Sequence, residues 1–384
     1  MRIIGLRRRQ DYSYYSHFFQ FLFVCFSFCL SVPANAGTPL GMLKKLGTLI
    51  DTLSVKDLDR RYIDKPEHPW QIIVKGNVNQ SDVKMDTYND YDEMNYTLSP
   101  RMKTEPSRYV GLWAGYRGYG LGYTVNTGGD KGSYLTFGAT GGSYGVNVRI
   151  HRFENNHPDL TVKLVSDEGV ENETSRADLL SPVKMRTLIA DGYYLFNGKR
   201  FSYAAAYDQS VIQKRSAGSL MAGAMYYYSH LNYASDNNAI LIELMKRIGR
   251  VKTWQGSVGV GYAYNWVPVR GLLVSTMVMP MLTFVNDMKA YGYLTNLFDF
   301  DDLDEEDLED EDWYINNIRI TPIRSETRHG GIALNLDARL SLTYNFGRYF
   351  VNTYGQFNNF RYHHNDTKGR LNDWFVNASV GIRL

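Results

Sequence analysis

A dense run of carboxylates between Asp299 and Asp312 is the most conspicuous set of chemically active side chains in this 384-residue chain. Carboxylate oxygens are the ligands that hard cations such as Ca²⁺ prefer, although an EF-hand loop also needs a glycine, which this run lacks. Packed like charges repel one another, so a solvated outer loop is the simpler interpretation. Weak, diffuse binding of a divalent cation is the alternative. The carboxylates concerned are Asp301, Asp302, Asp304, Glu305, Glu306 and Asp307.

Three short motifs resemble known sites but lack the surroundings that those sites need. Gly141–Gly145 matches the Gly-x-Ser-x-Gly of a hydrolase nucleophile elbow, which requires a strand-to-helix turn, whereas here it links two predicted strands. No helix follows Gly118–Gly122, so it does not form a nucleotide-binding loop. His363 and His364 precede Asp366, but adjacent residues of an extended chain point apart. We therefore expect no catalytic residue, metal site or cofactor.

A set of inward-pointing polar residues is more informative. On the wall of a barrel, such side chains can hydrogen-bond across the lumen and either fill it or line a channel, and the sequence leaves both outcomes open. The polar stretch Gln209–Ser219, which includes Lys214 and Arg215, forms either an ordinary turn or a constriction inside the lumen. The candidate lumen residues are Arg149, His151, Arg200, Asp208, Asp337 and Arg339.

The stretch Gly331–Tyr344 indicates the kind of element that positions these residues. Every even position from Ile332 to Tyr344 is apolar, and nearly every odd position is polar, which is typical of a strand between two different environments. The alternation is long for a soluble sheet but suits a tilted membrane-crossing strand of about 9–11 residues. Because Asp337 and Arg339 share the polar face, that face indicates a wet lumen, and the pattern predicts a transmembrane β-barrel.

The N-terminus has the layout of a secretory signal peptide. Three arginines (Arg7 to Arg9) precede the apolar run Phe18–Leu30, and Ala34–Ala36 offers small residues at a cleavage site. An uncleaved membrane anchor is the alternative, but the run is short for a helix that needs about 20 residues to span a bilayer. Residues 1–36 are therefore predicted to be removed. Both cysteines, Cys25 and Cys29, leave with them, so the mature chain has no disulfide.

Loss of residues 1–36 changes the formal charge from +2 to −1, since four arginines and one aspartate are removed. A chain without basic excess gives no indication of nucleic-acid binding. Residues 37–68 have apolar residues at helical spacing up to Leu53, and Pro66 and Pro69 close the segment. This short periplasmic helical segment is either a loose lead-in or a plug or partner-binding helix. Residues 69–384 are predicted to form the barrel.

The strand pattern along residues 69–384 predicts an all-β, antiparallel, up-and-down barrel of about 12 strands, within a range of 10–14. The segment 109–126 leaves the number open, because the alternation slips by one residue at Arg117–Gly118, through either a bulge or a tight turn. Polar sequence predicts loops at Asn77–Asp92 and 154–182. Asn197–Gly198 predicts a two-residue hairpin. The strand after that hairpin is expected to carry Phe201, Tyr203, Ala205 and Tyr207.

Loop lengths give the expected orientation. In single-chain bacterial barrels, periplasmic turns are short and outer loops are long. The loops at 287–330 and 362–373 are therefore expected outside the cell, and the turns at 265–269 and 345–347 in the periplasm. The final strand, Trp374–Leu384, alternates up to the last residue and is expected to close the barrel. Tyrosines near strand ends agree with interfacial girdles.

Three stretches resemble an uncharacterised domain-of-unknown-function family of Gram-negative outer-membrane barrel proteins: Phe196–Tyr203, Gln213–Ser219 and Gly259–Pro268. The resemblance extends from about Tyr62 to Leu384. It implies location in the outer membrane and a barrel architecture, but it brings no established activity or site. The extended acidic run is a feature of this sequence rather than of the family pattern.

Two functional classes follow from these patterns. The first, which we favour, is a non-enzymatic pore, transport-associated protein or envelope scaffold in the cell outer membrane. The second is a barrel enzyme acting on lipid or lipopolysaccharide, which would need a nucleophile, a base and an orienting group that the sequence does not reveal. Expected partners are outer-membrane lipids and lipopolysaccharide, the barrel-assembly machinery and a weakly held divalent cation at the acidic loop, with no nucleic acid.

Overall fold

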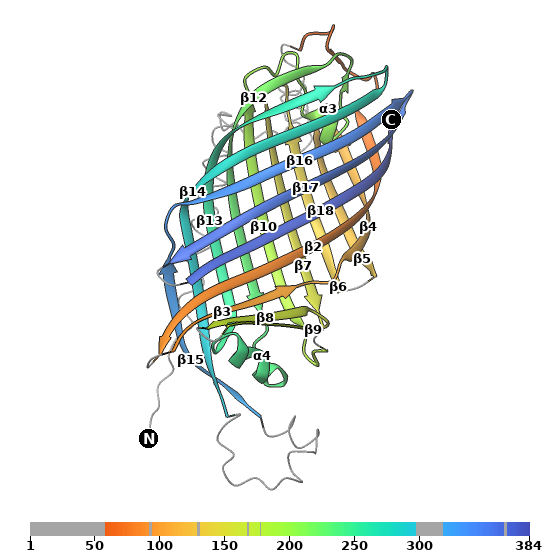
Figure 1. The fold of residues 1–384 in the computed structure, drawn as a ribbon. Helices are drawn as coiled ribbons and strands as arrows, with labels where there is room; N and C mark the ends of the chain where they lie inside the picture. Colours follow the sequence, from red (N-terminus) through yellow and green to blue (C-terminus); the bar gives the residue numbers. More distant parts are fainter. Residues whose placement is uncertain are drawn as a thin grey trace, which may run out of the picture. The chain divides into compact units, whose positions relative to one another are not determined.

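The computed structural model describes residues 58–91, 94–128, 131–166, 169–176, 178–296, 318–364 and 367–384. Within these ranges, twelve antiparallel strands close into a barrel (Figure 1). Closure comes from pairing between the first barrel strand, β2 (Trp70–Tyr91), and the last, β18 (Thr367–Arg383). At the seam, the backbone N–H of Trp70 donates to Leu384 O (3.1 Å). The predicted barrel of 12 strands is confirmed.

Each barrel strand pairs with the next barrel strand along the chain, as an up-and-down barrel requires. The other ten barrel strands are β4 (Ser107–Tyr116), β5 (Tyr119–Gly128), β6 (Lys131–Thr140), β7 (Tyr144–Asn155), β10 (Val183–Leu195), β12 (Ala217–Asn232), β13 (Ile248–Trp266), β14 (Leu272–Thr295), β16 (Ala333–Phe346) and β17 (Tyr349–His364).

The slip at Arg117–Gly118 is a tight turn between β4 and β5, not a bulge. Arg117 has φ 49° and Gly118 has φ 89°. Positive φ at both central residues is the geometry of the two-residue hairpin turn that matches the twist of flanking strands. This turn decides the strand number, which the sequence had left open.

The two ends of the barrel differ in the length of their connections. One end, here called the short-turn end, carries the C-terminus and the turns at 117–118, 141–143, 267–271 and 347–348. The opposite, loop end carries additional elements, gathered at the bottom of Figure 1. They are β3 (Met94–Lys103), β8 (Asp159–Ser166), β9 (Gly169–Arg176), β15 (Ile320–His329), the 3₁₀ helix η1 (Asp236–Asn238) and α4 (Ala239–Leu244).

Several predicted loops are strands that extend beyond the membrane band. β2 continues through most of the predicted loop Asn77–Asp92, and β8 and β9 form a hairpin within the predicted loop 154–182. β14 likewise continues to Thr295 and pairs with β15. On β2 the outward positions after Val78 are polar (Gln80, Asp82 and Lys84), so the periodicity that reveals a membrane strand ends there although the backbone pairing continues.

The two faces of the wall have the opposite polarity to those of a soluble protein. On β16, Ser341 is 1 % exposed, whereas its neighbours Leu340 and Leu342 are 60 % and 50 % exposed. The same pattern holds on β13, where Asn265 is fully buried and Val260 is exposed. Apolar side chains outside and polar ones inside are typical of a barrel whose outer face contacts lipid.

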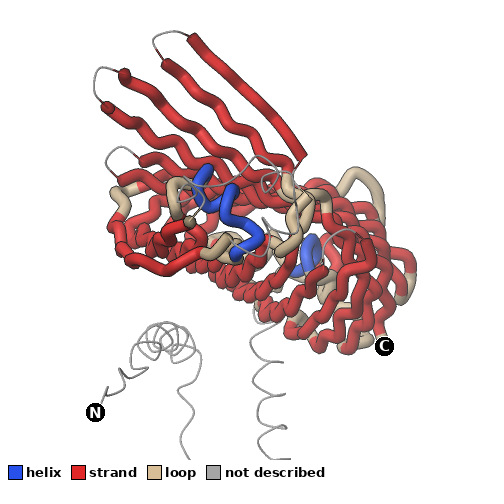
Figure 2. The backbone as a smooth tube through the Cα atoms, turned by 90° about the horizontal axis from the view of Figure 1, so that it is seen from below, coloured by secondary structure: helices blue, strands red, loops and turns tan. Residues whose placement is uncertain are grey.

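Helices are few and short among the described residues (Figure 2). None of those in the described ranges is both long and apolar enough to cross a membrane. Besides η1 and α4, the described residues form one helix, α3 (Ala204–Tyr207), in the connection between β10 and β12. This helix lies near the short-turn end (Figure 1).

Candidate functional site: the lumen and its plug

The connection between β10 and β12, residues 196–216, folds back into the barrel and is called the plug below. Its helix α3 contacts inward-facing residues of strands that are distant in the sequence. Ala206 O accepts hydrogen bonds from Ser341 Oγ (2.7 Å) and Asn352 Nδ2 (3.1 Å). Gln209 O accepts from Arg383 Nη2 (2.9 Å). Because these partners point into the lumen, the plug occupies the lumen at the short-turn end.

The predicted hairpin at Asn197–Gly198 is therefore wrong in its second half. The chain turns over residues 196–200, but the segment with Phe201 and Tyr203 is part of the plug and not a wall strand. Phe201 is fully buried. The apolar alternation there is real, but its side chains pack against the inside of the wall, which sequence periodicity cannot distinguish from lipid.

The alternative in which Gln209–Ser219 enters the lumen agrees with the structure only for its first part. Gln209 and Gln213 are buried, whereas Lys214 and Arg215 are exposed, and β12 begins at Ala217. A two-stranded sheet connects the plug to residues 58–64, which precede the first barrel strand and are called the lead-in below. Its strands are β1 (Ile63–Asp64) and β11 (Ile212–Gln213).

One side of the plug packs against an apolar wall. Phe201 and Tyr203 join a cluster of buried side chains from the inner faces of β10, β12, β13 and β14. The Tyr193 and Tyr203 rings lie 4.2 Å apart. The cluster's methionines, which adapt to irregular gaps, are Met221, Met225, Met277, Met279 and Met281.

Gln213 fixes the plug to itself and to the wall. Its Oε1 accepts from Ser202 N (3.0 Å) and Asn265 Nδ2 (3.0 Å). Its Nε2 donates to the carbonyls of Arg200 (2.6 Å) and Arg215 (2.9 Å). A buried amide with all these bonds made leaves little freedom for alternative plug conformations.

Next to its polar side, where Ala206 and Gln209 are bonded to the wall, the plug also meets a buried ion cluster through Tyr203. Arg339 on β16 lies 2.7 Å from the Asp337 carboxylate and 3.1 Å from that of Asp191 on β10. Arg339 also donates to the hydroxyl of Tyr203 on the plug. Asp337 Oδ1 accepts from Gln356 Nε2 (3.2 Å). Buried charges persist only when paired and hydrogen-bonded, so the cluster holds β10, β16 and the plug in one arrangement.

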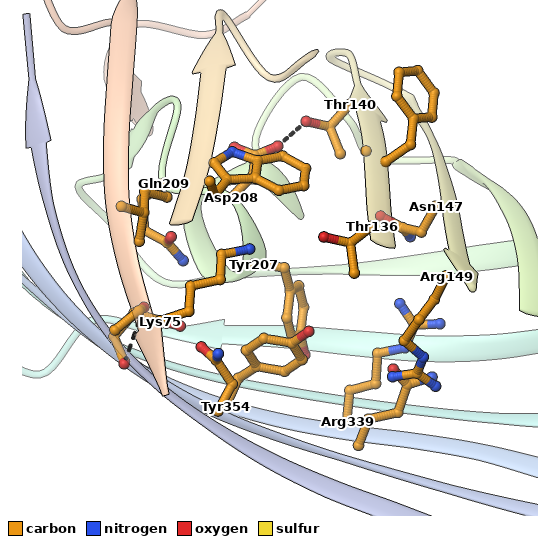
Figure 3. Close-up of a pocket in the computed structure, with 18 of the residues that line it drawn as sticks. Lys75, Thr136, Thr140, Asn147, Arg149, Tyr207, Asp208, Gln209, Arg339 and Tyr354 are labelled. Atoms are coloured by element: carbon orange, nitrogen blue, oxygen red, sulfur yellow. Dashed lines mark hydrogen bonds between the residues drawn. The ribbon is translucent and has the colours of Figure 1, made fainter. Parts of the chain in front are cut away.

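Between this side of the plug and the wall lies a cavity of about 100 Å³, large enough for several water molecules. Tyr207 and Asp208 of the plug face it, with Asp208 bonded to Thr140 (Figure 3). From the wall, Lys75 places its ammonium 4.1 Å from the Trp113 ring. Charged groups of both signs therefore line a narrow, polar space.

Arg149 faces the same cavity from β7. Its guanidinium is 3.9 Å from the Asp373 carboxylate and 4.2 Å from the Phe375 ring centre. Its Nη2 is buried and has no hydrogen-bond partner among the described residues. A bound water or small anion would satisfy this donor, as buried polar groups generally require.

Of the predicted lumen residues, Arg149, Asp208 and Arg339 line the cavity, and Asp337 is bonded to Arg339. His151 is also inside, but its ring stacks 3.8 Å from that of Tyr134, and its Nε2 lies 3.0 Å from the Tyr109 hydroxyl. The acidic residues 301–307 lie outside the described residues. The side chains of His363 and His364 also lie outside the described part of the structure.

Arg200 is not on the barrel wall. It lies exposed in the plug's first turn, 3.8 Å from Asp59 of the lead-in. Hydrogen bonds from Arg61 (2.8 Å from Nη2), with a smaller contribution from the charge of Arg200, lower the pKa of the Asp59 carboxyl to about 2. Both arginines therefore keep Asp59 ionised, and Arg200 attracts it to the plug.

Sequence reasoning missed Asp191, Lys75 and Tyr203. Asp191 shares the inward face of β10 with Ile189 and Tyr193, so the alternation of that strand could have revealed it. Lys75 lies in a stretch of poor alternation, and Tyr203 was placed on a wall strand. Within the described ranges, no group of three or more histidine, cysteine or acidic residues could hold a metal ion.

The motif Gly141–Gly145 lies between β6 and β7, with no helix after the serine, so it does not form a nucleophile elbow. The family described as "Domain of unknown function (DUF4421)" matches residues 57–383. The chain belongs to the DUF4421 family. A search of curated protein sequences gave no significant match.

Among solved structures, the DUF4421 chain is similar to the outer membrane protein OprG from Pseudomonas aeruginosa (9 % identity, TM-score 0.26, covering 83 % of this chain and 98 % of that one). It is similar to the β domain of the Bordetella autotransporter BrkA (10 %, 0.28, 81 % and 99 %). It is also similar to the Pseudomonas putida toluene transporter TodX (7 %, 0.26, 83 % and 90 %). Likeness at this level carries no information about function.

Proposed function

We propose that this protein resides in the outer membrane of a Gram-negative cell and passes small polar or ionic solutes through its lumen when the plug rearranges. The polarity of the wall supports the location. On β13, Trp254 and Tyr264 face outward ten residues apart. At about 3.3 Å per residue and a tilt of about 40°, they are separated by about 25 Å along the membrane normal, the height of the apolar band of such barrels.

The contact between the plug and the polar wall is the observation that carries the transport role. A lumen filled only for stability would gain more from apolar packing, because buried ion clusters often stabilise less than hydrophobic residues of the same volume. Here Arg339, Asp191 and the cavity beside them retain charge where the plug meets the wall. Charged, hydrated linings are what a path for polar solutes needs.

The plug is also built to move without leaving the barrel. Both of its ends continue into wall strands, β10 and β12, and its apolar side is fixed to the methionine-lined wall. Separation from the polar wall would replace hydrogen bonds of Ser341, Asn352 and Arg383 by bonds to water, which cost little in net free energy. The path would then open along the polar wall.

Conductance in planar bilayers tests this proposal. The wild-type protein is compared with a variant in which residues 201–214 are replaced by a short Gly-Ser turn, and with Gln213→Ala as a milder change that keeps the chain length. We expect rare, small openings in the wild type, more frequent ones in Gln213→Ala, and a several-fold larger steady current without the plug. Correct folding is checked by resistance of the barrel to unfolding in sodium dodecyl sulfate.

Absence of current from all three folded proteins would overturn the pore. If the same preparations released fatty acids from phospholipid or lipopolysaccharide, the barrel-enzyme alternative would replace it.

A further inference from the structure

The outer surface of the barrel carries a row of basic residues that the lumen does not use. Cross-strand pairing aligns Arg152 on β7 with Arg186 on β10, and Arg186 with His230 on β12. It then aligns His230 with Lys252 on β13, and Lys252 with Lys289 on β14. Five neighbouring strands thus present five basic side chains at one height. All five lie on the outward face, since the residues beside them in each strand point inward.

A second row, one step nearer the loop end, strengthens the first. Lys184 and Arg250 face outward there, in the row that also holds Glu154 and Tyr291. The Arg250 guanidinium lies 3.7 Å from the Tyr291 ring centre, and the Lys252 and Lys289 ammonium groups lie 5.7 and 5.3 Å from it. Three cations therefore surround one aromatic ring. The two rows together are called the basic belt: Arg152, Lys184, Arg186, His230, Arg250, Lys252 and Lys289.

The basic belt has no sufficient counter-charge within the described chain. Directly opposed side chains in a sheet lie about 4.5–5.5 Å apart at Cβ, and like charges in these positions, here Arg152 with Arg186 and Lys252 with Lys289, are destabilising. None of the belt residues forms an ion pair with another described residue. Asp287 lies in the next row toward the short-turn end. Its carboxylate accepts a hydrogen bond from Trp254 Nε1 (2.8 Å) and lies 2.7 Å from His329 Nδ1. Glu154 is the one carboxylate within the two rows. Among the described residues, the positive charge of the belt therefore exceeds the negative charge beside it, and an anion from outside them would offset the repulsion.

The height of the belt indicates which anion is available. The next row toward the short-turn end contains Tyr228 and Trp254, the aromatic residues at the limit of the apolar band on the loop-end side. The belt therefore begins where lipid acyl chains end and headgroups begin, on the side of the loop end. If the loop end faces outward, as the length of its connections predicts, this is the headgroup level of the outer leaflet.

We infer that the basic belt binds the phosphate groups of lipopolysaccharide in the outer leaflet. Arg152, Arg186 and Arg250 offer forked donors that match phosphate oxygens, and the lysines offer compact charges between them. The acyl chains of the same molecule would lie on the apolar surface between the belt and the short-turn end, along Leu188, Tyr226 and Val258. This inference rests on the proposed location in the outer membrane but not on the pore.

Binding of lipid A to the detergent-solubilised full chain tests the inference. The variant Arg186→Gln/Lys252→Gln/Lys289→Gln removes three charges from the belt. The matched control, Lys199→Gln/Arg270→Gln/Arg348→Gln, removes three exposed charges from turns at the opposite end. Each surface basic residue contributes a factor of about five to binding of anionic lipid, so we expect about a hundredfold weaker binding for the belt variant and little change for the control. The wild-type affinity should fall with rising salt.

Two further ligands identify the source of the phosphate. Dephosphorylated lipid A should bind wild type and belt variant equally weakly, and millimolar inorganic phosphate should not displace lipid A. Equal affinity for lipid A with and without phosphate would overturn the inference, as would equal losses in the belt and control variants. Displacement by free phosphate would overturn the lipid as its source. The binding experiment does not depend on conductance. A barrel that binds lipid A but does not conduct in planar bilayers would therefore refute only the pore.

Discussion

The two sides of the plug meet different walls. Toward β10 and β12–β14, Phe201 and Tyr203 are packed among methionines. Toward β16–β18, the backbone carbonyls of Ala206 and Gln209 are bonded to polar side chains, next to the charged cavity. Apolar contacts lose their full transfer free energy when they separate in water, whereas polar contacts exchange one hydrogen bond for another. In the proposed opening, the apolar side would therefore be the anchor and the polar side the face that separates.

The largest effect is expected from Arg339→Met, which leaves Asp337 and Asp191 as buried, unpaired carboxylates. Breaking a buried pair in this way costs about 3–5 kcal/mol, so the free energy of unfolding should fall by that amount in urea titrations. The matched variant Arg339→Met/Asp191→Asn/Asp337→Asn removes all three charges and should recover most of the loss. If the triple variant is no more stable than the single one, the ion cluster is not what holds the polar side.

Phe201→Ala tests the anchor. Truncation of a fully buried phenylalanine costs about 3 kcal/mol or more, and the loss should appear both in the free energy of unfolding and as more frequent channel opening. Phe196→Ala is the matched control, because Phe196 is 66 % exposed on the outside of the same end. Equal losses of the free energy of unfolding in the two variants would show that burial of Phe201 on the apolar side of the plug adds no stability.

Gln213→Ala should have a smaller effect. It leaves the amide of Ser202 and the side chain of Asn265 without one acceptor each, which costs about 1–3 kcal/mol per buried group left unpaired. Hydrogen exchange of the plug amides should accelerate, while exchange in the strands of the barrel stays unchanged. Acceleration throughout the barrel would mean that Gln213 stabilises the whole fold rather than the plug conformation.

The smallest effect concerns the lead-in and depends on pH. Arg61 and Arg200 lower the pKa of Asp59 from 3.8 to about 2, so above about pH 4 the carboxyl is ionised and attracted to Arg200 of the plug. This attraction favours the docked lead-in and is lost as the pH falls toward 2. A spin label at Glu67 should become more mobile over this range in the wild type. In Asp59→Asn the mobility should be raised at neutral pH and should not change with pH. A titration of the same size in both proteins would exclude Asp59 as its origin.

Part of the candidate site could be predicted from the sequence. Arg149, Asp337 and Arg339 lie on long alternating strands, where the polar face must turn from lipid, and the structure places all three in the lumen. Arg200 was misplaced because the plug also alternates, although it is not part of the wall. The signal peptide, the helical stretch up to Leu53 and the acidic run fall outside the described residues and stay predictions.

The amino-acid sequence alone determined which face of each membrane strand is outward, because lipid and water impose opposite side chains on alternate positions. It also determined the antiparallel order, since short turns join neighbours. Tertiary structure decided which connection enters the lumen and which charges meet. Asp191, Arg339 and Tyr203 come together only through closure of the barrel, and Arg186, Lys252 and Lys289 align only through strand register. Contacts between residues so distant in the chain follow from how the sheet closes, and no local pattern encodes that.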